Sequence, residues 1–374
     1  MAITDTVVGA VRRLVTREPN ARPLRPKIGI TGSFGRGNYG DELYVKNYQH
    51  WFGPWADLYL LTGLPRHSYL QDFGNSFVDM MDAVVLGGGD LLCPYAPKID
   101  RDFINATYLR RPVHIAGIGV ERNKPDIHAS VLDRWTKFLT HPNIKSISTR
   151  DPGSAEWVKE HIQPSLPVGS IPDLVCALPL PKAIKPSGAP IVGLITRHIK
   201  DPKNYRIIEE VAATLMAKGW RVRHIIGGVA GHGAKDLENS RHLHVDGKET
   251  MHSEELDDIS RALGECSLVL SMKLHTTLVA AMYGVPTVCV NPVVKARAFM
   301  KAIGREELAI NPTDRKLLEL IESDVPAPDA DRIKILREEA SEYMRSLSRR
   351  LWKDFLTADP TRRGILPASP RLPV

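Results

Sequence analysis

Residues 28–42 read Ile28-Gly-Ile-Thr-Gly-Ser-Phe-Gly-Arg-Gly-Asn-Tyr-Gly-Asp-Glu42. The apolar run at 28–31 predicts a buried strand, and the glycines after it predict a tight turn. Asp41 and Glu42 then favour the positive end of a helix that begins at this turn. A strand that passes through a short turn into a helix is the building unit of a parallel sheet covered by helices. The segment therefore predicts an α/β fold.

Two sets of apolar runs, separated by helix-like stretches, extend this pattern along the chain. Further strands are expected at residues 58–62, 83–86, 113–116 and 144–148 in the first set, and at 191–195, 222–226, 268–271 and 287–290 in the second. Helices in the second set are expected near residues 205–217, 254–263 and 275–283. Four prolines and Ser187-Gly188 interrupt the pattern at residues 178–190, as in an interdomain linker. We therefore expect two doubly wound α/β domains.

The chain of 374 residues is long enough for two such domains. After them, apolar residues between 333 and 351 follow helical spacing, and a proline-rich stretch comes last. The expected parts are an N-terminal amphipathic segment at 1–26, an N-terminal domain at 27–180, a C-terminal domain at 188–325, a long helix at 329–356 and a disordered tail at 357–374.

The hydropathy of the sequence bears on the cellular location of the protein. No apolar run approaches the roughly 20 residues of a membrane-spanning helix, and the N-terminus lacks a secretory signal, so we expect a cytoplasmic protein. An apolar stripe with arginines opposite it at residues 5–17 fits two roles. It suits peripheral contact with the inner face of the membrane, and it suits docking on the protein's own body. The sequence leaves both roles open.

Charge and cysteine usage limit the partners. The net charge of +7 favours anionic partners, such as phosphorylated metabolites or a membrane surface. The basic residues are dispersed and no nucleic-acid-binding module appears, so nucleic acid is not expected. The four cysteines are scattered without a CxxC pair, and His242 and His244 lack a matching carboxylate pattern. We therefore predict neither a disulfide framework nor a metal site.

Glycines follow two of the expected strands, at the sheet edge where such folds bind ligands. Gly35, Gly37 and Gly40 match the GxGxxG pattern of dinucleotide sites. No acidic residue follows the second strand, however, so a nicotinamide cofactor is not predicted. The turns still offer backbone amides to an anion, although a purely structural tight turn explains the glycines equally well. The candidate contacts at the two turns are Asn38, Gly40, Asp41, Gly88, Gly89 and Asp90.

Lys273 and His275 flank the start of an apolar helix that follows the strand at 268–271. The free amides and the dipole of a helix N-terminus attract phosphate or carboxylate, so this turn is a candidate anion site with a titratable imidazole. A capping or core role for the histidine is the alternative. The residues that follow other strands at the same edge, where two such domains would form a cleft, are Arg197, Asn291 and Lys295. A plain salt bridge is the alternative for the arginine.

Six segments occur in an order that resembles the polysaccharide pyruvyl transferase family, from about Ile28 to Gly304. They are Gly37-Asn-Tyr-Gly-Asp-Glu42, Val85-Leu-Gly-Gly-Gly89, Ser148-Thr-Arg-Asp151, Pro172-Asp173, Ser271-Met-Lys-Leu-His275 and Gly284-Val-Pro286. The family motif Arg-Leu-His is Lys273-Leu274-His275 in this chain. Lysine keeps the positive charge but loses the planar two-pronged grip of arginine on a carboxylate or phosphate.

The resemblance implies two Rossmann-like doubly wound domains that face each other across a cleft, in a GT-B-like arrangement. It also implies transfer of a pyruvyl group from phosphoenolpyruvate, as donor substrate and without a cofactor, to a sugar or lipid-linked oligosaccharide. The product would be a ketal on a precursor of an exopolysaccharide or cell-surface glycan.

The residue roles follow as hypotheses from this donor. His275 protonates its methylene carbon, and one or other carboxylate takes a proton from the sugar. The anionic groups are held by Lys273, Arg197 and Lys295, and the candidate bases are Asp41 and Asp90. Two rival functions stay open. One is a GT-B glycosyltransferase that uses a nucleotide-sugar donor, and the other is a non-catalytic glycan-binding relative in which the lysine marks lost chemistry.

Overall fold

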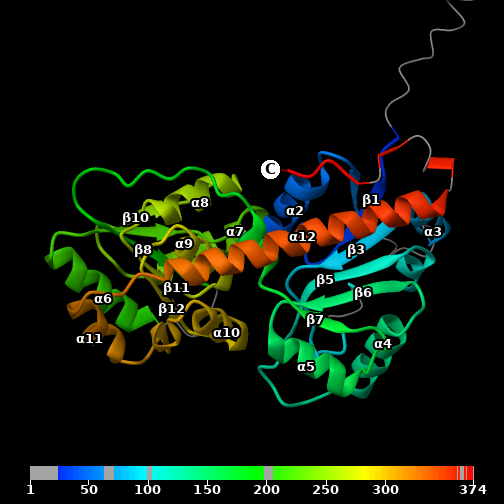
Figure 1. Ribbon diagram of the computed structural model, residues 1–374. Helices are drawn as coiled ribbons and strands as arrows, with labels where there is room; N and C mark the ends of the chain where they lie inside the picture. Colours follow the sequence, from blue (N-terminus) through cyan, green and yellow to red (C-terminus); the bar gives the residue numbers. More distant parts are fainter. Residues whose placement is uncertain are drawn as a thin grey trace, which may run out of the picture.

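A computed structural model describes residues 24–62, 71–98, 103–197, 205–359, 361–362, 366–367 and 369–373. The apolar stripe expected at 5–17 lies outside these residues. Two sheets, each flanked by helices, stand side by side (Figure 1). All strand pairs in the described residues are parallel, apart from one isolated antiparallel bridge. The predicted α/β class is confirmed.

The first sheet has the strand order β2-β1-β3-β5-β6-β7, and β4 pairs with β5 beside this path. Its strands are β1 (Lys27–Thr31), β2 (Asp57–Leu60), β3 (Ala83–Gly87), β4 (Asp90–Leu92), β5 (Val113–Val120), β6 (Ile144–Thr149) and β7 (Val168–Ser170). The helices between them are α2 (Tyr39–Phe52), α3 (Gln71–Asp79), η3 (Ala106–Arg110), α4 (Ala129–Leu139), α5 (Pro152–His161) and η4 (Leu174–Ala177). Every residue of β3 and β5 is buried, as expected for central parallel strands.

The second sheet has the order β10-β9-β8-β11-β12-β13. Its strands are β8 (Ile191–Ile195), β9 (Arg221–Ile225), β10 (Glu249–Met251), β11 (Leu268–Ser271), β12 (Thr287–Val290) and β13 (Ala309–Ile310). The helices are α6 (Arg206–Ala217), α7 (Ala230–Asn239), η6 (Ser240–His242), α8 (Leu256–Gly264), α9 (Leu274–Met282), α10 (Val294–Ala302), η7 (Glu306–Leu308) and α11 (Lys316–Glu322). In both sheets the order of the strands reverses beside the first strand, between β1 and β3 and between β8 and β11. The loops after these strands therefore lie at the carboxyl edge of each sheet, on either side of the reversal.

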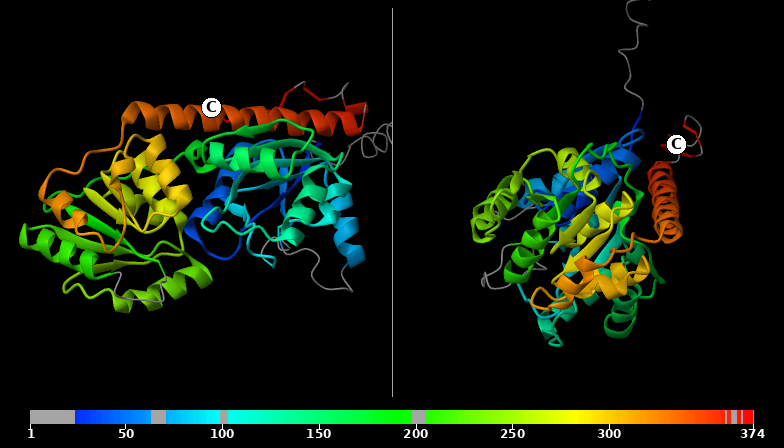
Figure 2. Two further views of the ribbon diagram at one scale, coloured as in Figure 1. Left: turned by 90° about the horizontal axis from the view of Figure 1, so that it is seen from below. Right: turned by 90° about the vertical axis from the view of Figure 1, so that its left-hand side faces the viewer.

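The long C-terminal helix α12 (Ala330–Ala358) crosses both sheets and ties them together (Figures 1 and 2). Its N-terminal half buries Ile333, and its C-terminal half buries Leu351 and Phe355 in the same core cluster. Asp354 lies 2.7 Å from Nε2 of His114, which comes from the middle of the first sheet. The predicted helix is therefore present and acts as a strap across the two units.

The segment after α12 contacts the body of the protein at several of its described residues. The Arg362 guanidinium donates a 3.0 Å hydrogen bond to Asp82, and Trp352 donates a 2.9 Å hydrogen bond to the carbonyl of Pro367. Extended, proline-rich backbone can dock on a surface in this way without a ladder of hydrogen bonds.

The glycine-rich turn after β1 joins the two sheets through backbone contacts. The amide of Val229 donates a 2.8 Å hydrogen bond to the carbonyl of Gly37, and Asn38 forms an isolated antiparallel bridge with Gly228. Gly37 has a φ of +85°, and a Cβ there would overlap with the Val229 carbonyl. This glycine is therefore needed for the close approach of the two halves.

Candidate active site

A cavity of about 320 Å³ lies between the carboxyl edges of the two sheets. It brings together residues that are up to about 260 positions apart in the sequence, as the topology of two facing sheets requires. The predicted site residues that line it are Asn38, Gly40, Asp41, Gly89, Asp90, Arg197, Lys273, His275, Asn291 and Lys295. Gly88 does not line it. With φ at +84°, Gly88 packs against the ring of Tyr44, where a Cβ would come within 2.6 Å.

His275 lies in the first turn of α9, where it is 8% exposed. Its Nε2 is 3.3 Å from Oδ2 of Asp173, an ion-pair distance across the two halves of the molecule. Tyr44 donates a 2.8 Å hydrogen bond to the same oxygen, and its ring meets the imidazole edge-on at 5.5 Å. Burial alone would raise the pKa of Asp173, but the positive fields of His275 and Arg150 hold it well below its usual range. Asp173 is therefore ionised beside the imidazole.

Gly40 provides the space for this histidine. A Cβ on Gly40 would overlap with Nδ1 of His275, so any larger residue would displace the ring or the start of α2. Asn38 caps the same helix by accepting a 3.1 Å hydrogen bond from the Gly40 amide. The Gly-Asn-Tyr-Gly segment thus sets how closely the two halves meet at the imidazole.

Asp41 is the cavity carboxyl with a raised proton affinity. Burial raises its pKa, against the opposing positive fields of His275 and Lys295. Its carboxylate faces Gly89, which has no side chain to fill the space between them. A carboxyl in this setting suits proton transfer better than permanent ion pairing.

The ammonium of Lys273 is engaged inside the wall of the cavity. It forms an ion pair with Asp236 of α7 and donates a 2.7 Å hydrogen bond to the carbonyl of Gly227. Burial lowers the pKa of Lys273, although the Asp236 charge opposes this shift. These contacts join α7 to the start of α9. The positive charge of Lys273 is therefore paired with the Asp236 carboxylate of the protein itself.

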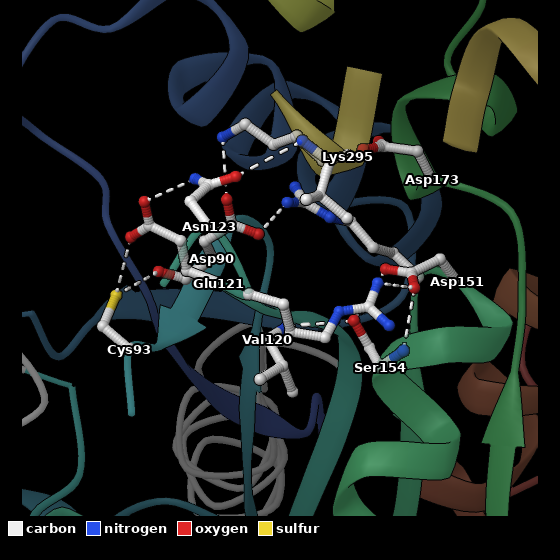
Figure 3. A network of polar contacts seen from close by, with 12 residues as sticks. Asp90, Cys93, Val120, Glu121, Asn123, Asp151, Ser154, Asp173 and Lys295 are labelled. Atoms are coloured by element: carbon white, nitrogen blue, oxygen red, sulfur yellow. Dashed lines mark hydrogen bonds and ion pairs between the residues drawn. The ribbon is translucent and has the colours of Figure 1, made fainter. Parts of the chain in front are cut away.

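Asp90 is the centre of a buried charged group (Figure 3). The Lys295 ammonium lies 2.9 Å from one of its oxygens, and Arg150 forms an ion pair with the other. The Arg150 guanidinium packs against Gly119, and its Nε and Nη1 atoms have no hydrogen-bond partner. Burial and the neighbouring Arg150 lower the pKa of Lys295 to about 8. In the sequence, Arg150 was noted only as part of the Ser148-Thr-Arg-Asp151 segment; its place directly after β6 was the signal for a cavity position.

Glu121 and Asn123 also line the cavity, and the sequence did not identify them. Asn123 donates a 2.9 Å hydrogen bond to Glu121 and accepts a 3.3 Å hydrogen bond from the Val294 amide (Figure 3). The second bond joins the loop after β5 to the start of α10, next to Lys295. The strand was expected to end at residue 116 but continues to Val120, because Gly117 and Gly119 interrupt the apolar run that marks it.

The start of α9 is available to an anion. Its N-cap, Lys273, makes no side-chain capping bond, so the amides of the first turn lack a partner from that side chain. The helix dipole adds positive potential at the same point. Asn291 follows β12, the strand next to β11, and lines the same cavity with a φ of +61°, a left-handed conformation that asparagine tolerates. Arg197, which also lines the cavity, is exposed.

The described part of the chain contains neither a cluster of metal-ligating side chains nor a helix that could span a membrane. No group of three or more histidine, cysteine or acidic side chains there is arranged to hold a metal ion. All four cysteines are buried as free thiols. None of the helices in the described ranges is both long and apolar enough to cross a bilayer.

Comparisons of sequence identify one family. The sequence model of the polysaccharide pyruvyl transferase family matches residues 25–292, which include both sheets up to the end of β12. No curated protein matches the chain.

Comparisons of structure identify the arrangement of the two units. The chain is similar to S. aureus MnaA in its structure with UDP (12% identity, TM-score 0.52, covering 90% of this chain and 98% of that one). It is similar to sucrose-phosphate synthase from Thermosynechococcus elongatus (12%, 0.51, 90% and 100%). It is also similar to UDP-GlcNAc 2-epimerase from Methanocaldococcus jannaschii (8%, 0.51, 87% and 99%). Likeness at these identities shows a shared GT-B-like fold with two facing Rossmann-like units.

Proposed function

The chain belongs to the polysaccharide pyruvyl transferase family, and we propose that it transfers a pyruvyl group from phosphoenolpyruvate to a sugar in the cavity between its sheets. The observation that carries this proposal is His275, which is paired with the buried Asp173 and lines the cavity together with Arg197 and Lys295. The reaction needs an acid at the donor's methylene carbon and cations for its carboxylate and phosphate. The cavity has residue types suited to both tasks.

Binding of the donor is assigned to the second half of the molecule. Lys295, Arg197 and the first-turn amides of α9 surround the same space and provide charge and N–H donors for two anionic groups. Lys273 has a different role in this proposal. Its ammonium is held inside the wall between Asp236 and the carbonyl of Gly227, and its side chain is 16% exposed, against 34% for Lys295. Lys273 therefore holds α7 and α9 in place beside the donor rather than binding it directly.

The proton transfers follow from the positions of the titratable groups. Protonated His275 gives a proton to the methylene carbon, which becomes a methyl group, and the neighbouring carbon becomes oxocarbenium-like. Asp173 orients the ring and stabilises its positive charge. One sugar hydroxyl attacks that carbon and gives its proton to Asp41, whose raised pKa favours acceptance.

A second attack completes the ketal. The phosphate leaves the same carbon with its bonding electrons, and the second hydroxyl of the sugar bonds there and loses its proton to the released phosphate. Asp41 returns its proton to the medium, and His275 is protonated again for the next cycle. Donor and sugar diol thus yield one ketal and one phosphate. The acceptor in this proposal is a sugar of an exopolysaccharide or cell-surface glycan precursor, pyruvylated in the cytoplasm.

A direct assay tests the proposal. Purified protein is incubated with phosphoenolpyruvate and a panel of nitrophenyl and lipid-linked sugars, and released phosphate is measured together with product mass. The proposal expects phosphate and ketal in equal amounts. Turnover of a uridine or guanosine diphosphate sugar without phosphate release from phosphoenolpyruvate would instead establish a glycosyltransferase. Tight glycan binding without turnover of either donor would establish a non-catalytic relative.

A further inference from the structure

The two walls of the active-site cavity differ in chemistry. The second half of the molecule contributes the cations Arg197 and Lys295 together with the start of α9. Besides Arg150, the charged and amide side chains that the first half contributes after its strands are Asp41, Asp90, Glu121 and Asn123. The proposed donor has two anionic groups, which suit the cations of the second half. The first half is therefore the wall for the acceptor, and the proposed reaction gives Glu121 and Asn123 no role.

The loop after β5 holds Glu121 and Asn123 in place at this wall (Figure 3). The Cys93 thiol donates a 3.3 Å hydrogen bond to one carboxylate oxygen of Glu121, and Asn123 donates a 2.9 Å hydrogen bond to the other. The backbone amide of Glu121 donates a 2.8 Å hydrogen bond to the carbonyl of Leu92, at the end of β4. Both side chains are thus ordered before a ligand arrives, which lowers the entropic cost of binding.

Glu121 carries a negative charge in this setting. Burial alone would raise its pKa, but hydrogen bonds from Tyr95, Asn123 and Cys93 hold this pKa below its usual value. All three of these partners are neutral groups, so they fix the ionised carboxylate without cancelling its charge.

The neighbouring Asp90 differs, because its charge is balanced by two cations. Lys295 lies 2.9 Å from one of its oxygens, and Arg150 forms an ion pair with the other. The positive field of Lys295 also favours the ionised form of Glu121, but less than the neutral hydrogen bonds do. An acceptor at this wall therefore meets the charge of Glu121 more directly than that of Asp90.

Both side chains keep hydrogen-bonding capacity for a sugar. Each carboxylate oxygen of Glu121 has two lone pairs, and the amide of Asn123 has a second N–H. A hydroxyl group can donate to the carboxylate, and a neighbouring hydroxyl oxygen can accept from the amide. A sugar with its own carboxylate would instead place a like charge beside Glu121, which opposes binding.

We infer that Glu121 and Asn123 bind hydroxyl groups of an uncharged acceptor sugar, and that Glu121 excludes uronic acids from the site. This inference rests on the proposed function, because it names the class of acceptor sugar for that reaction. It places the sugar on the same wall as Asp41, the proposed base. The selectivity comes from repulsion of the wrong sugar as well as attraction of the right one.

Direct binding tests the inference without reference to catalysis. Nitrophenyl glucoside and galactoside, and the corresponding glucuronide and galacturonide, are titrated into the full-length protein by calorimetry. Each pair differs only at the sixth carbon of the sugar, which carries a hydroxyl group in one and a carboxylate in the other. In at least one pair the uronide should have a Kd about tenfold or more above that of the hexoside. A smaller ratio in both pairs, or no measurable binding of either hexoside, would overturn the inference.

A matched pair of variants assigns the selectivity to one residue. Glu121→Gln keeps the shape of the side chain and removes its charge, and Glu156→Gln makes the same change of charge at an exposed position on α5. In Glu121→Gln the ratio of the two Kd values should fall below about threefold, whereas Glu156→Gln should keep the full ratio. A ratio that stays above this value in Glu121→Gln would show that another group excludes the uronide, and would overturn the inference.

Kinetics separate this inference from the proposed function. In the transfer assay, Glu121→Ala should raise the KM for the acceptor sugar by about tenfold, because a charge-assisted hydrogen bond is lost. The KM for phosphoenolpyruvate should stay unchanged. An unchanged acceptor KM, or an equal rise in both KM values, would overturn the acceptor site and leave the proposed function in place. Selective binding of hexosides without any pyruvyl transfer would do the reverse.

Discussion

The Nε2 atom of His275 lies 3.3 Å from Oδ2 of Asp173, which also accepts a 2.8 Å hydrogen bond from Tyr44. The carboxylate and the tyrosine come from the first half of the molecule and the histidine from the second. The contact therefore forms only when the two halves are docked. It fixes the ring at the cavity wall and keeps a negative charge beside it.

Replacement of His275 by alanine should lower kcat by about 100-fold or more, because the donor would lose its acid. Circular dichroism and the urea midpoint should stay near those of the natural protein. His244→Ala, at an exposed position on the same half, is the matched control and should keep full activity. Near-normal turnover of His275→Ala would remove this residue from the role.

Asp173→Asn should lower kcat by about tenfold to 100-fold, with a smaller change in the KM for phosphoenolpyruvate. The amide keeps the shape of the side chain but not the charge that stabilises the imidazolium. Tyr44→Phe removes only the hydrogen bond to the same oxygen, so its effect on kcat should be smaller. An equal loss of kcat in Asp173→Asn and Tyr44→Phe would show that the packing of these side chains, rather than the charge of Asp173, accounts for the effect on the reaction.

The activity should fall as the pH rises through about 8, the pKa to which burial lowers Lys295. Above this pH the lysine loses its proton, and the donor loses a cationic partner. The quantity to measure is kcat/KM for phosphoenolpyruvate as a function of pH. Its profile should have a descending limb with a midpoint near pH 8. Lys295→Arg keeps its charge throughout this range and should lose the limb. An unchanged limb in Lys295→Arg would assign it to another group.

Lys273→Met should destabilise the fold by roughly 3–5 kcal/mol, because Asp236 would remain buried without its counter-charge. Urea unfolding measures this loss. The double variant with Asp236→Leu should recover much of the stability, since both charges are then absent. For function, Lys273→Arg should leave donor affinity and turnover unchanged if this lysine only positions α7. A marked gain in donor affinity would show that it contacts the donor.

Gly40→Ala should impair both folding and turnover, because the added methyl group would occupy the place of the His275 ring. A stability loss of about 1–3 kcal/mol is typical of such overpacking. Gly231→Ala is the control, because a Cβ at that exposed glycine of α7 meets no atom within 4 Å. It should leave both properties intact, and equal effects in the two variants would contradict the steric account.

The fold was predictable where apolar runs were long. Buried strands such as β3 and β11 stand out, whereas β4, β7 and β10 have three residues each and give no clear period. Helix α7 was missed because Gly231 and Gly233 lower its helical propensity. Its absence from the prediction also hid the partner of Lys273, which lies on that helix.

The sequence predicts which residues follow the strands and lie at the site. It does not predict which of these residues contact each other. Parallel strands place their following residues at one edge, so His275 and Lys295 could be expected near each other in the second sheet, and Asp41 and Asp90 in the first. Which charges pair there depends on how the two halves dock, and no local pattern encodes that docking. The roles of Arg150 and Asp173 emerged only from their neighbours across the cavity.

The central claim is pyruvyl transfer with a proton delivered to the donor's methylene carbon, and an isotope experiment tests it most directly. The purified protein is incubated in D₂O with phosphoenolpyruvate and an accepted sugar, and the product is analysed by mass spectrometry and NMR. The account predicts a ketal with one deuterium in its methyl group, one phosphate released per ketal, and formation of both products about 100-fold or more slower in His275→Ala. Absence of a ketal with every acceptor, or a ketal whose methyl group carries no deuterium, would contradict it.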